Sequence, residues 1–275
     1  MYLWGLAKNL GNQKKWHSLG CDTVWPISIK DIFWSVWNKI DFALRSRIRW
    51  SRAIPIGTPI SAIDRRLQEE CQQFLALFNW QPILKSLTPF PVLTIADIGA
   101  RNFAFAPALD KHFKAMGYEA TVHGIEIDAY RRLINFHTRA DYGNYFAKSI
   151  RSGQYHPIDF LTWHQPLQIG FLLNPFVTRE ALLAWGLPLS TLQPEAIFHH
   201  AYSLLKPQNG VLILSNIDEH EITISYQLAK EAGFVIGEAQ TWFPTGMAKA
   251  LPRFGTVLYT YPPLSFHRER GKGVS

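Results

Sequence analysis

The stretch Thr94-Ile-Ala-Asp-Ile-Gly-Ala-Arg-Asn102 decides the fold of this chain, and Val122-His-Gly-Ile-Glu-Ile-Asp128 follows it about two dozen residues later. An apolar run that ends in Asp97 and turns at Gly99, then a helical segment, then a second apolar run that ends in an acid, together predict a βαβ unit. Gly99 lets the backbone pass close to a ligand because it has no Cβ, and Glu126 can accept two hydrogen bonds from a ribose diol. The pattern therefore indicates a site for a nucleoside cofactor.

The rest of the chain from Val92 onward alternates in the α/β manner. The last two apolar runs have no helix between them, so they must pair as a hairpin and give the sheet an antiparallel C-terminal edge. We therefore predict an α/β fold with a doubly wound, mostly parallel seven-stranded sheet and an antiparallel C-terminal strand. The expected strands are 92–98, 121–127, one near 156–161, 169–174, a run that ends at Ser215, 234–242 and 254–261; the expected helices are 104–116, 129–139, 178–205 with breaks at Pro188 and Pro194, and 219–232.

The first 90 residues differ in composition from the remainder. They hold 12 of the 28 Lys and Arg residues but 6 of the 21 Asp and Glu residues, and seven of the ten tryptophans. A basic surface interleaved with aromatic side chains is one mark of contact with nucleic acid or an anionic membrane surface. We predict a basic, Trp-rich helical extension over 1–90, a cofactor-binding domain over 91–262 and a polar tail over 263–275.

An amphipathic helix is predicted within this extension. Its apolar stripe is expected to pack on the neighbouring domain, because amphipathic helices generally cover cores; a membrane-surface or nucleic-acid role is the alternative. A second helix is expected to open at Ser61 and Asp64 and to run to about Leu77. We expect the extension to cover or approach the cofactor site. The stripe comprises Ile29, Phe33, Val36, Trp37, Ile40, Leu44 and Ile48.

Composition also excludes several classes of protein. A hydrophobic content of 47% argues against general disorder, and no uncharged apolar run approaches 18 residues, so no membrane span is expected. The N-terminal residues lack the basic flank and cleavage site of a secretory signal. The only two cysteines, Cys21 and Cys71, suit a reducing cytoplasm. No cluster of His, Cys, Asp or Glu has a metal-ligand spacing, so no metal site is expected.

Several motifs, taken in order, resemble those of the class I S-adenosylmethionine-dependent methyltransferases over residues 91–262. Ala96-Asp-Ile-Gly-Ala-Arg101 resembles the family's first glycine-rich motif, and Gly124-Ile-Glu126 resembles its ribose-binding strand end. Leu205-Lys-Pro-Gln-Asn-Gly210 and Ala232-Gly-Phe234 resemble its late turn and the entry to its last strands. The resemblance implies S-adenosylmethionine as cofactor and a methyl acceptor that the sequence does not name.

The resemblance also implies roles for individual residues. Glu126 would hold the ribose hydroxyls, with Asp128 as the competing acid. Asn174, followed by Pro175 and Phe176, stands where amino-methylating members place a catalytic Asn or Asp. The methionine end of the cofactor would lie on Asp97, Gly99, Ala100, Arg101 and Asn102, and the adenine on Asp159 and Phe160.

We consider two alternatives to a methyltransferase: a degenerate binding protein, which stays open, and a nicotinamide-dependent oxidoreductase, which the sequence argues against. Arg101 and Phe103 stand where the family often has further glycines, so the chain could be a catalytically degenerate binding protein that uses its basic extension for a nucleic-acid, membrane or protein partner. Asp97 could simply cap the following turn. A nicotinamide-dependent oxidoreductase would need Gly-x-Gly-x-x-Gly after the first strand and an acid about 20 residues later, and the chain has neither.

Overall fold

The computed structural model describes residues 29–243 and 253–262, and a seven-stranded sheet forms their centre. The order across the sheet is β3-β2-β1-β4-β5-β7-β6, and β7 runs antiparallel to both of its neighbours. The predicted fold class is confirmed. We expected the antiparallel strand at the edge of the sheet. It lies one position further in, because β7 is between β5 and β6 and β6 forms the edge. The strands are β1 (Leu93–Ile98), β2 (Ala120–Ile125), β3 (Gly153–His156), β4 (Ile169–Leu173), β5 (Val211–Asn216), β6 (Val235–Trp242) and β7 (Arg253–Tyr259).

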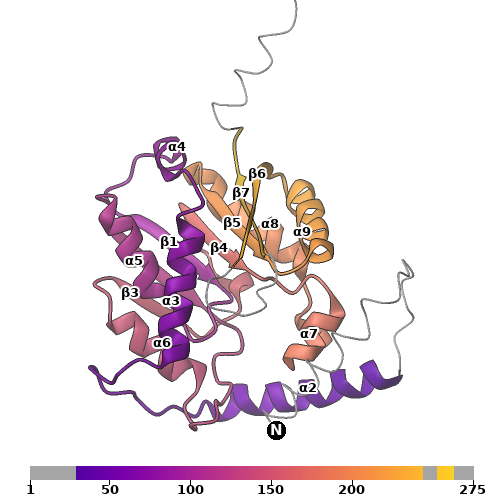
Figure 1. Cartoon of the computed structure of the whole chain (residues 1–275). Coiled ribbons are helices and arrows are strands. Elements are labelled where there is room, and N and C mark those ends of the chain that lie inside the picture. Colours follow the sequence, from indigo (N-terminus) through magenta and orange to yellow (C-terminus); the bar gives the residue numbers. More distant parts are fainter. Residues whose placement is uncertain (1–28, 244–252, 263–275) are drawn as a thin grey trace, which may run out of the picture.

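Helices cover both faces of the sheet (Figure 1). One core lies between the sheet and α3 (Ala62–Leu75), α4 (Trp80–Ser86), α5 (Ala106–Ala115) and α6 (Arg139–Lys148). The other lies beneath α8 (Pro194–Leu205) and α9 (Glu219–Ala232). Since both faces are covered, the central strands are buried on both sides and read as nearly continuous apolar runs. Short 3₁₀ segments occur at Phe160–Thr162, Leu189–Thr191 and Lys206–Gln208.

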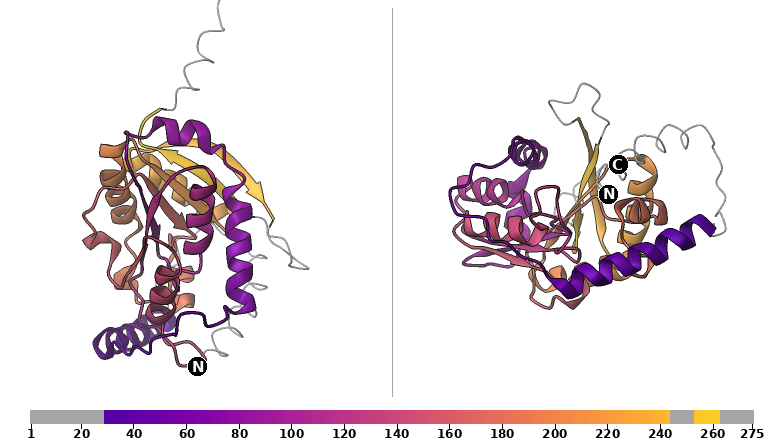
Figure 2. Two further views of the ribbon diagram at one scale, coloured as in Figure 1. Left: turned by 90° about the vertical axis from the view of Figure 1, so that its left-hand side faces the viewer. Right: turned by 90° about the horizontal axis from the view of Figure 1, so that it is seen from below.

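Two further helices lie at the edge of the sheet where the parallel strands end. α7 (Arg179–Trp185) follows β4, and α2 (Ile29–Ile48) crosses below it (Figures 1 and 2). The predicted helices at 29–48, at 219–232 and from Ser61 onward are confirmed, and Ser61 caps α3 by accepting a hydrogen bond from the Asp64 amide at 3.0 Å.

Part of the N-terminal extension belongs to the main core. Trp80 of α4 stacks edge-on against Phe113 with ring centroids 5.0 Å apart, and its indole donates to the Leu75 carbonyl at 2.7 Å. Phe74 of α3 is buried in the same cluster as the side chains of β1. The predicted boundary at residue 90 stays a prediction. α3 and α4 pack on the same face of the sheet as α5 and α6, in one hydrophobic core.

One predicted helix is wrong. Residues 129–138 form a loop, and the helix after β2 is α6, which begins ten residues later than predicted. A capping box starts it: the Thr138 hydroxyl accepts from the Asp141 amide, and the Asp141 carboxylate accepts from the Thr138 amide. Phe136, with φ at +64°, adopts a conformation that a helix excludes.

Two other expectations need correction. β3 ends at His156, earlier than the predicted strand near 156–161, because Pro157 lacks the N–H that a strand ladder requires. The apolar stripe of α2 does not pack on the neighbouring domain. It faces away from the protein, and the polar side of the helix makes the contacts.

Candidate functional site

The site lies at the switch point of the sheet, between the carboxyl ends of β1 and β4. From β1 the chain proceeds to β2 and β3 on one side and then crosses to β4 on the other. In open α/β sheets, ligands bind outside the strand ends at such a point. Asp97 and Gly99 lie at the end of β1, and Asn174 directly follows β4, so three of the predicted site residues are at this edge.

The turn after β1 leaves its backbone accessible. Gly99 has φ at +76°, and a Cβ added there would meet no atom within 4 Å. The amides of Gly99 and Ala100 donate to the Ile125 carbonyl at 2.9 and 3.0 Å, which ties the turn to the end of β2. The turn is thus open at Gly99, which lies at the switch point.

Asp97 is the buried acid of this turn. Its side chain is 3% exposed, and its Oδ2 atom has no hydrogen-bond partner among the described residues. Burial and the charge of Glu126 raise the pKa of Asp97 to about 7, while Arg101 acts in the opposite direction. A buried carboxylate oxygen without a partner is costly in a folded protein, so Asp97 is suited to bind a cationic or hydrogen-donating ligand group.

Glu126 organises the same turn. Its Oε2 atom accepts from the Arg101 amide at 2.8 Å, and its Oε1 atom accepts from the Asp128 amide at 2.7 Å. The guanidinium of Arg139 lies 3.6 Å from Oε1. Each carboxylate oxygen can accept more than one hydrogen bond, so these contacts leave Glu126 able to accept from a ribose hydroxyl as well.

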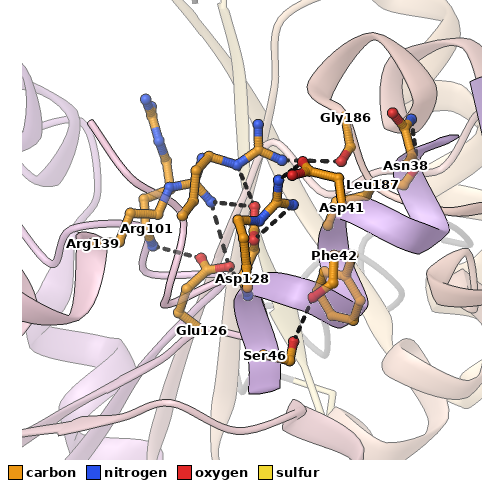
Figure 3. Close-up of polar contacts among 12 residues, drawn as sticks. Asn38, Asp41, Phe42, Ser46, Arg101, Glu126, Asp128, Arg139, Gly186 and Leu187 are labelled. Carbon is orange, nitrogen blue, oxygen red and sulfur yellow. Dashed lines mark hydrogen bonds and ion pairs between the residues drawn. The ribbon is translucent and has the colours of Figure 1, made fainter. Parts of the chain in front are cut away.

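Asp128 has a different role from Glu126 (Figure 3). It is 2% exposed and pairs with three guanidinium groups: Arg45 at 3.2 Å, Arg139 at 3.3 Å and Arg131. Its carboxylate is therefore the centre of an ion-pair network that joins α2, the loop after β2 and α6. Of the two competing acids, Glu126 is the one that contacts the turn after β1.

The two bulky residues of the turn point in different directions. Phe103 is fully buried, and its ring packs beside Gly124 and Tyr155 in the core. Arg101 instead reaches toward α7, where its guanidinium lies 4.8 Å from the centre of the Trp185 ring. Phe103 therefore takes no space at the switch point, whereas the Arg101 side chain joins the two sides of it.

Three other predicted cofactor residues make contacts within the protein. The Asn102 side-chain Nδ2 donates to the Asp64 carboxylate of α3 at 2.9 Å. The Asp159 carboxylate accepts from the Leu161 amide at 3.0 Å and so caps a 3₁₀ turn, and Phe160 is buried beneath α8. Their contact with an adenine stays a prediction.

Asparagine side chains lie at the ends of β4 and β5. Asn174 has φ at +57°, its backbone amide donates to the Ser215 carbonyl at 2.6 Å, and its Oδ1 atom is buried without a partner among the described residues. Asn216, which the sequence analysis missed, ends β5 fully buried, and its Oδ1 atom also has no partner there. Its position at the end of a buried strand was a signal that could have identified it. The described residues contain no group of three His, Cys, Asp or Glu side chains that could hold a metal ion.

No protein-family model matches the sequence, and a search of curated proteins found no match. Solved structures with a similar fold include a candidate RNA methyltransferase from Pyrococcus horikoshii (12% identity, 80% of this chain and 97% of that one, TM-score 0.47). They also include the N-methyltransferase NodS from Bradyrhizobium japonicum (12% identity, 71% and 96%, TM-score 0.46) and magnesium protoporphyrin IX methyltransferase from Synechocystis with bound S-adenosylmethionine (15% identity, 86% and 99%, TM-score 0.43). These are likenesses of fold, and a functional assignment has to rest on the residues of this chain.

Proposed function

We propose that this chain is a methyltransferase that binds S-adenosylmethionine at the switch point between β1 and β4. The observation that carries the proposal is the buried Asp97, whose Oδ2 atom has no partner among the described residues, next to the open backbone of Gly99. A ligand with positive charge would give this carboxylate the partner it lacks. S-adenosylmethionine carries an ammonium group and a sulfonium, and the two early motifs that resemble its binding family, Ala96-Asp-Ile-Gly-Ala-Arg101 and Gly124-Ile-Glu126, lie at this edge of the sheet.

Each part of the cofactor would be bound by a different group of residues. Asp97 and the turn of Gly99, Ala100, Arg101 and Asn102 would hold the methionine end, and Glu126 would accept from the ribose hydroxyls. Asp159 and Phe160 would lie toward the adenine. The bound cofactor supplies a methyl group that is activated by its attachment to a sulfonium. The protein's task is mainly to align the acceptor with that methyl group.

Asn174 is the proposed positioning group for the acceptor. Within the described part of the chain, its buried Oδ1 atom has no partner at the end of β4, and neither has the Oδ1 atom of Asn216 at the neighbouring end of β5. Both are hydrogen-bond acceptors, so they would orient an acceptor that carries an N–H or O–H group. The acceptor itself is not specified. We expect the protein to act in the cytoplasm because its two cysteines are widely spaced.

Isothermal titration of the full chain with S-adenosylmethionine, its demethylated product and NAD tests the proposal. The first two should bind and NAD should not. Asp97→Asn removes the ionisable carboxylate and should weaken binding about tenfold to a hundredfold, the scale of a lost hydrogen bond to a charged group. Glu195→Gln, a carboxylate change on the exposed side of α8, is the matched control and should leave binding unchanged.

Two outcomes of the titration would contradict the proposed function. A wild-type chain that binds neither S-adenosylmethionine nor its product, but gains binding on Arg101→Gly, would identify a degenerate domain in which Arg101 occupies the site. Binding of NAD alone would favour the oxidoreductase instead.

A further inference from the structure

α2 is amphipathic, and its orientation is the reverse of that of a helix that covers a core. The side that faces the protein is mainly polar, although it includes the half-buried Trp34 and Phe42. Asn38 donates to the Leu187 carbonyl at 3.1 Å, the Ser35 hydroxyl accepts from the Leu189 amide at 3.4 Å, and Arg45 pairs with Asp128. The apolar side faces outward. We call its seven large residues the outer stripe; they are 46% to 63% exposed and comprise Ile32, Phe33, Val36, Trp37, Ile40, Leu44 and Ile48.

This outward side is not an isolated feature. The segment that follows α2 exposes Trp50, which lies under the guanidinium of Arg132 at 4.9 Å. That arginine belongs to the loop after β2, in which Ile134 and Phe136 are about 70% exposed. Monomeric soluble proteins rarely expose so many large apolar side chains close together, so a partner is needed to explain them.

The exposed charges around the outer stripe are mostly basic. Among the described residues 31–60, the exposed charged side chains are those of Lys39, Arg47, Arg49 and Arg52, together with Asp41, whose side chain is 45% exposed but paired with Arg45. The two acids of α2 are only partly exposed. The surface therefore combines an apolar stripe with positive charge, which matches a partner that is apolar beneath a negatively charged layer.

We propose that the outer stripe of α2 docks on the surface of a bilayer that contains anionic phospholipids, with the helix axis in the membrane plane. The aliphatic side chains would enter the boundary between headgroups and acyl chains, the basic residues would contact lipid phosphates, and Trp37 and Trp50 suit the interface. None of the described helices is long and apolar enough to cross a membrane.

Other occupants fit the surface less well. A nucleic acid binds through phosphate contacts and stacked aromatic rings, and gains little from the Ile, Val and Leu residues that dominate the stripe. A second copy of this chain would bring its own basic residues against Lys39 and Arg47, and like charges oppose such a contact. The bilayer is the partner that uses both the apolar and the basic components. This inference does not depend on the proposed methyl transfer.

Sedimentation of the full chain with lipid vesicles tests the proposal. We expect binding to vesicles of phosphatidylcholine and phosphatidylserine, much weaker binding to phosphatidylcholine alone, and a loss of binding as salt is added. Phe33→Ser with Ile40→Ser should lower the partition coefficient roughly tenfold or more, because it removes two large apolar groups from the interface. The control pair Val92→Ser with Met116→Ser alters exposed apolar residues at the opposite edge of the sheet and should bind as the wild type does.

The contribution of the basic residues to vesicle binding is tested with a charge-reversal variant and a matched control variant. Lys39→Glu with Arg47→Glu should abolish the preference for phosphatidylserine. Lys85→Glu with Lys111→Glu, on exposed sites of α4 and α5, changes the net charge equally and should keep that preference. Circular dichroism checks that all variants fold.

Three results would overturn the proposal: equal vesicle binding by the wild type and the Phe33→Ser, Ile40→Ser variant; wild-type dimers that dissociate in that variant without any vesicle binding; or RNA binding, instead of lipid binding, that is lost in it. The last two would assign the surface to a second copy or to nucleic acid. Because none of the readouts measures methyl transfer, failure here is distinguishable from failure of the proposed function.

Discussion

Arg45 of α2 lies 3.2 Å from the carboxylate of Asp128, a residue that follows β2. Arg131 and Arg139 pair with the same carboxylate. Asp128→Asn would leave three guanidinium groups close together with only Glu126 and Asp41 as counter-charges, so we expect a loss of about 3–5 kcal/mol in the free energy of unfolding. Arg45→Gln leaves Asp128 two other partners and should cost about 1 kcal/mol. Urea denaturation of both variants would measure this, and equal losses would contradict the network.

The affinity for S-adenosylmethionine should depend on pH through Asp97. Its pKa of about 7 in the free protein means that the carboxyl is mostly neutral below that pH. A cationic ligand binds the ionised form better, so binding would release a proton and the affinity should rise from about pH 5.5 to 7.5. Titration in two buffers of different ionisation enthalpy measures the released proton. In Asp97→Asn the affinity should be lower and almost flat over this range; a persistent slope would assign the proton to another group.

The same acid should reduce the stability of the fold at alkaline pH. The pKa of Asp97 is raised from 3.8 to about 7 on folding, so between these values the folded state binds more protons than the unfolded state. Stability contributed by this group is therefore lost as pH rises from about 4 to about 7. Asp97→Asn removes the penalty and should raise the free energy of unfolding at pH 8, by up to about 4 kcal/mol, with little effect at pH 4. Thermal or urea unfolding at both pH values measures the difference, and a variant less stable at pH 8 would refute it.

The placement of Phe103 can be tested by overpacking. A Cβ added at Gly124 would lie 2.5 Å from the Phe103 ring, so Gly124→Ala should destabilise the protein by about 1–3 kcal/mol. Phe103→Leu has a cost of its own, but in the double variant the two losses should be less than additive, because the smaller side chain makes room for the methyl group. A double-mutant cycle by urea denaturation measures the coupling. Strict additivity would show that Phe103 does not pack against Gly124.

Strand and helix positions in the second half of the chain were predictable because their signals are local. The helix at Glu219–Ala232 was predicted with its bounds, since Asp218 caps its start and Gly233, with φ at +103°, ends it. The helix predicted at 129–139 was wrong because the α/β alternation placed a helix directly after the second strand. The Thr138 and Asp141 pair was visible in the sequence as a start signal for α6.

The site was predictable only in part. The position of Asp97, Gly99 and Asn174 at one edge could be predicted because each ends a buried strand or directly follows one, and parallel strands place such residues at one edge; their roles stay predictions. The contacts of Arg45 with Asp128 and of Arg101 with Trp185 join segments far apart in the chain, and no local pattern encodes them. The orientation of α2 was missed for the same reason. Periodicity shows that a helix has two sides, but which side meets the protein depends on the distant partner of Arg45.

The polar attachment of α2 has a thermodynamic consequence. Contacts that bury apolar surface weaken on cooling and carry a large heat-capacity change. The inward side of α2 is held by Asn38, Ser35 and the Arg45 ion pair as well as by the half-buried rings of Trp34 and Phe42, so its release should involve a smaller heat-capacity change than the release of a helix that covers a core. The attachment of the helix should therefore weaken less on cooling than an attachment made by apolar side chains alone.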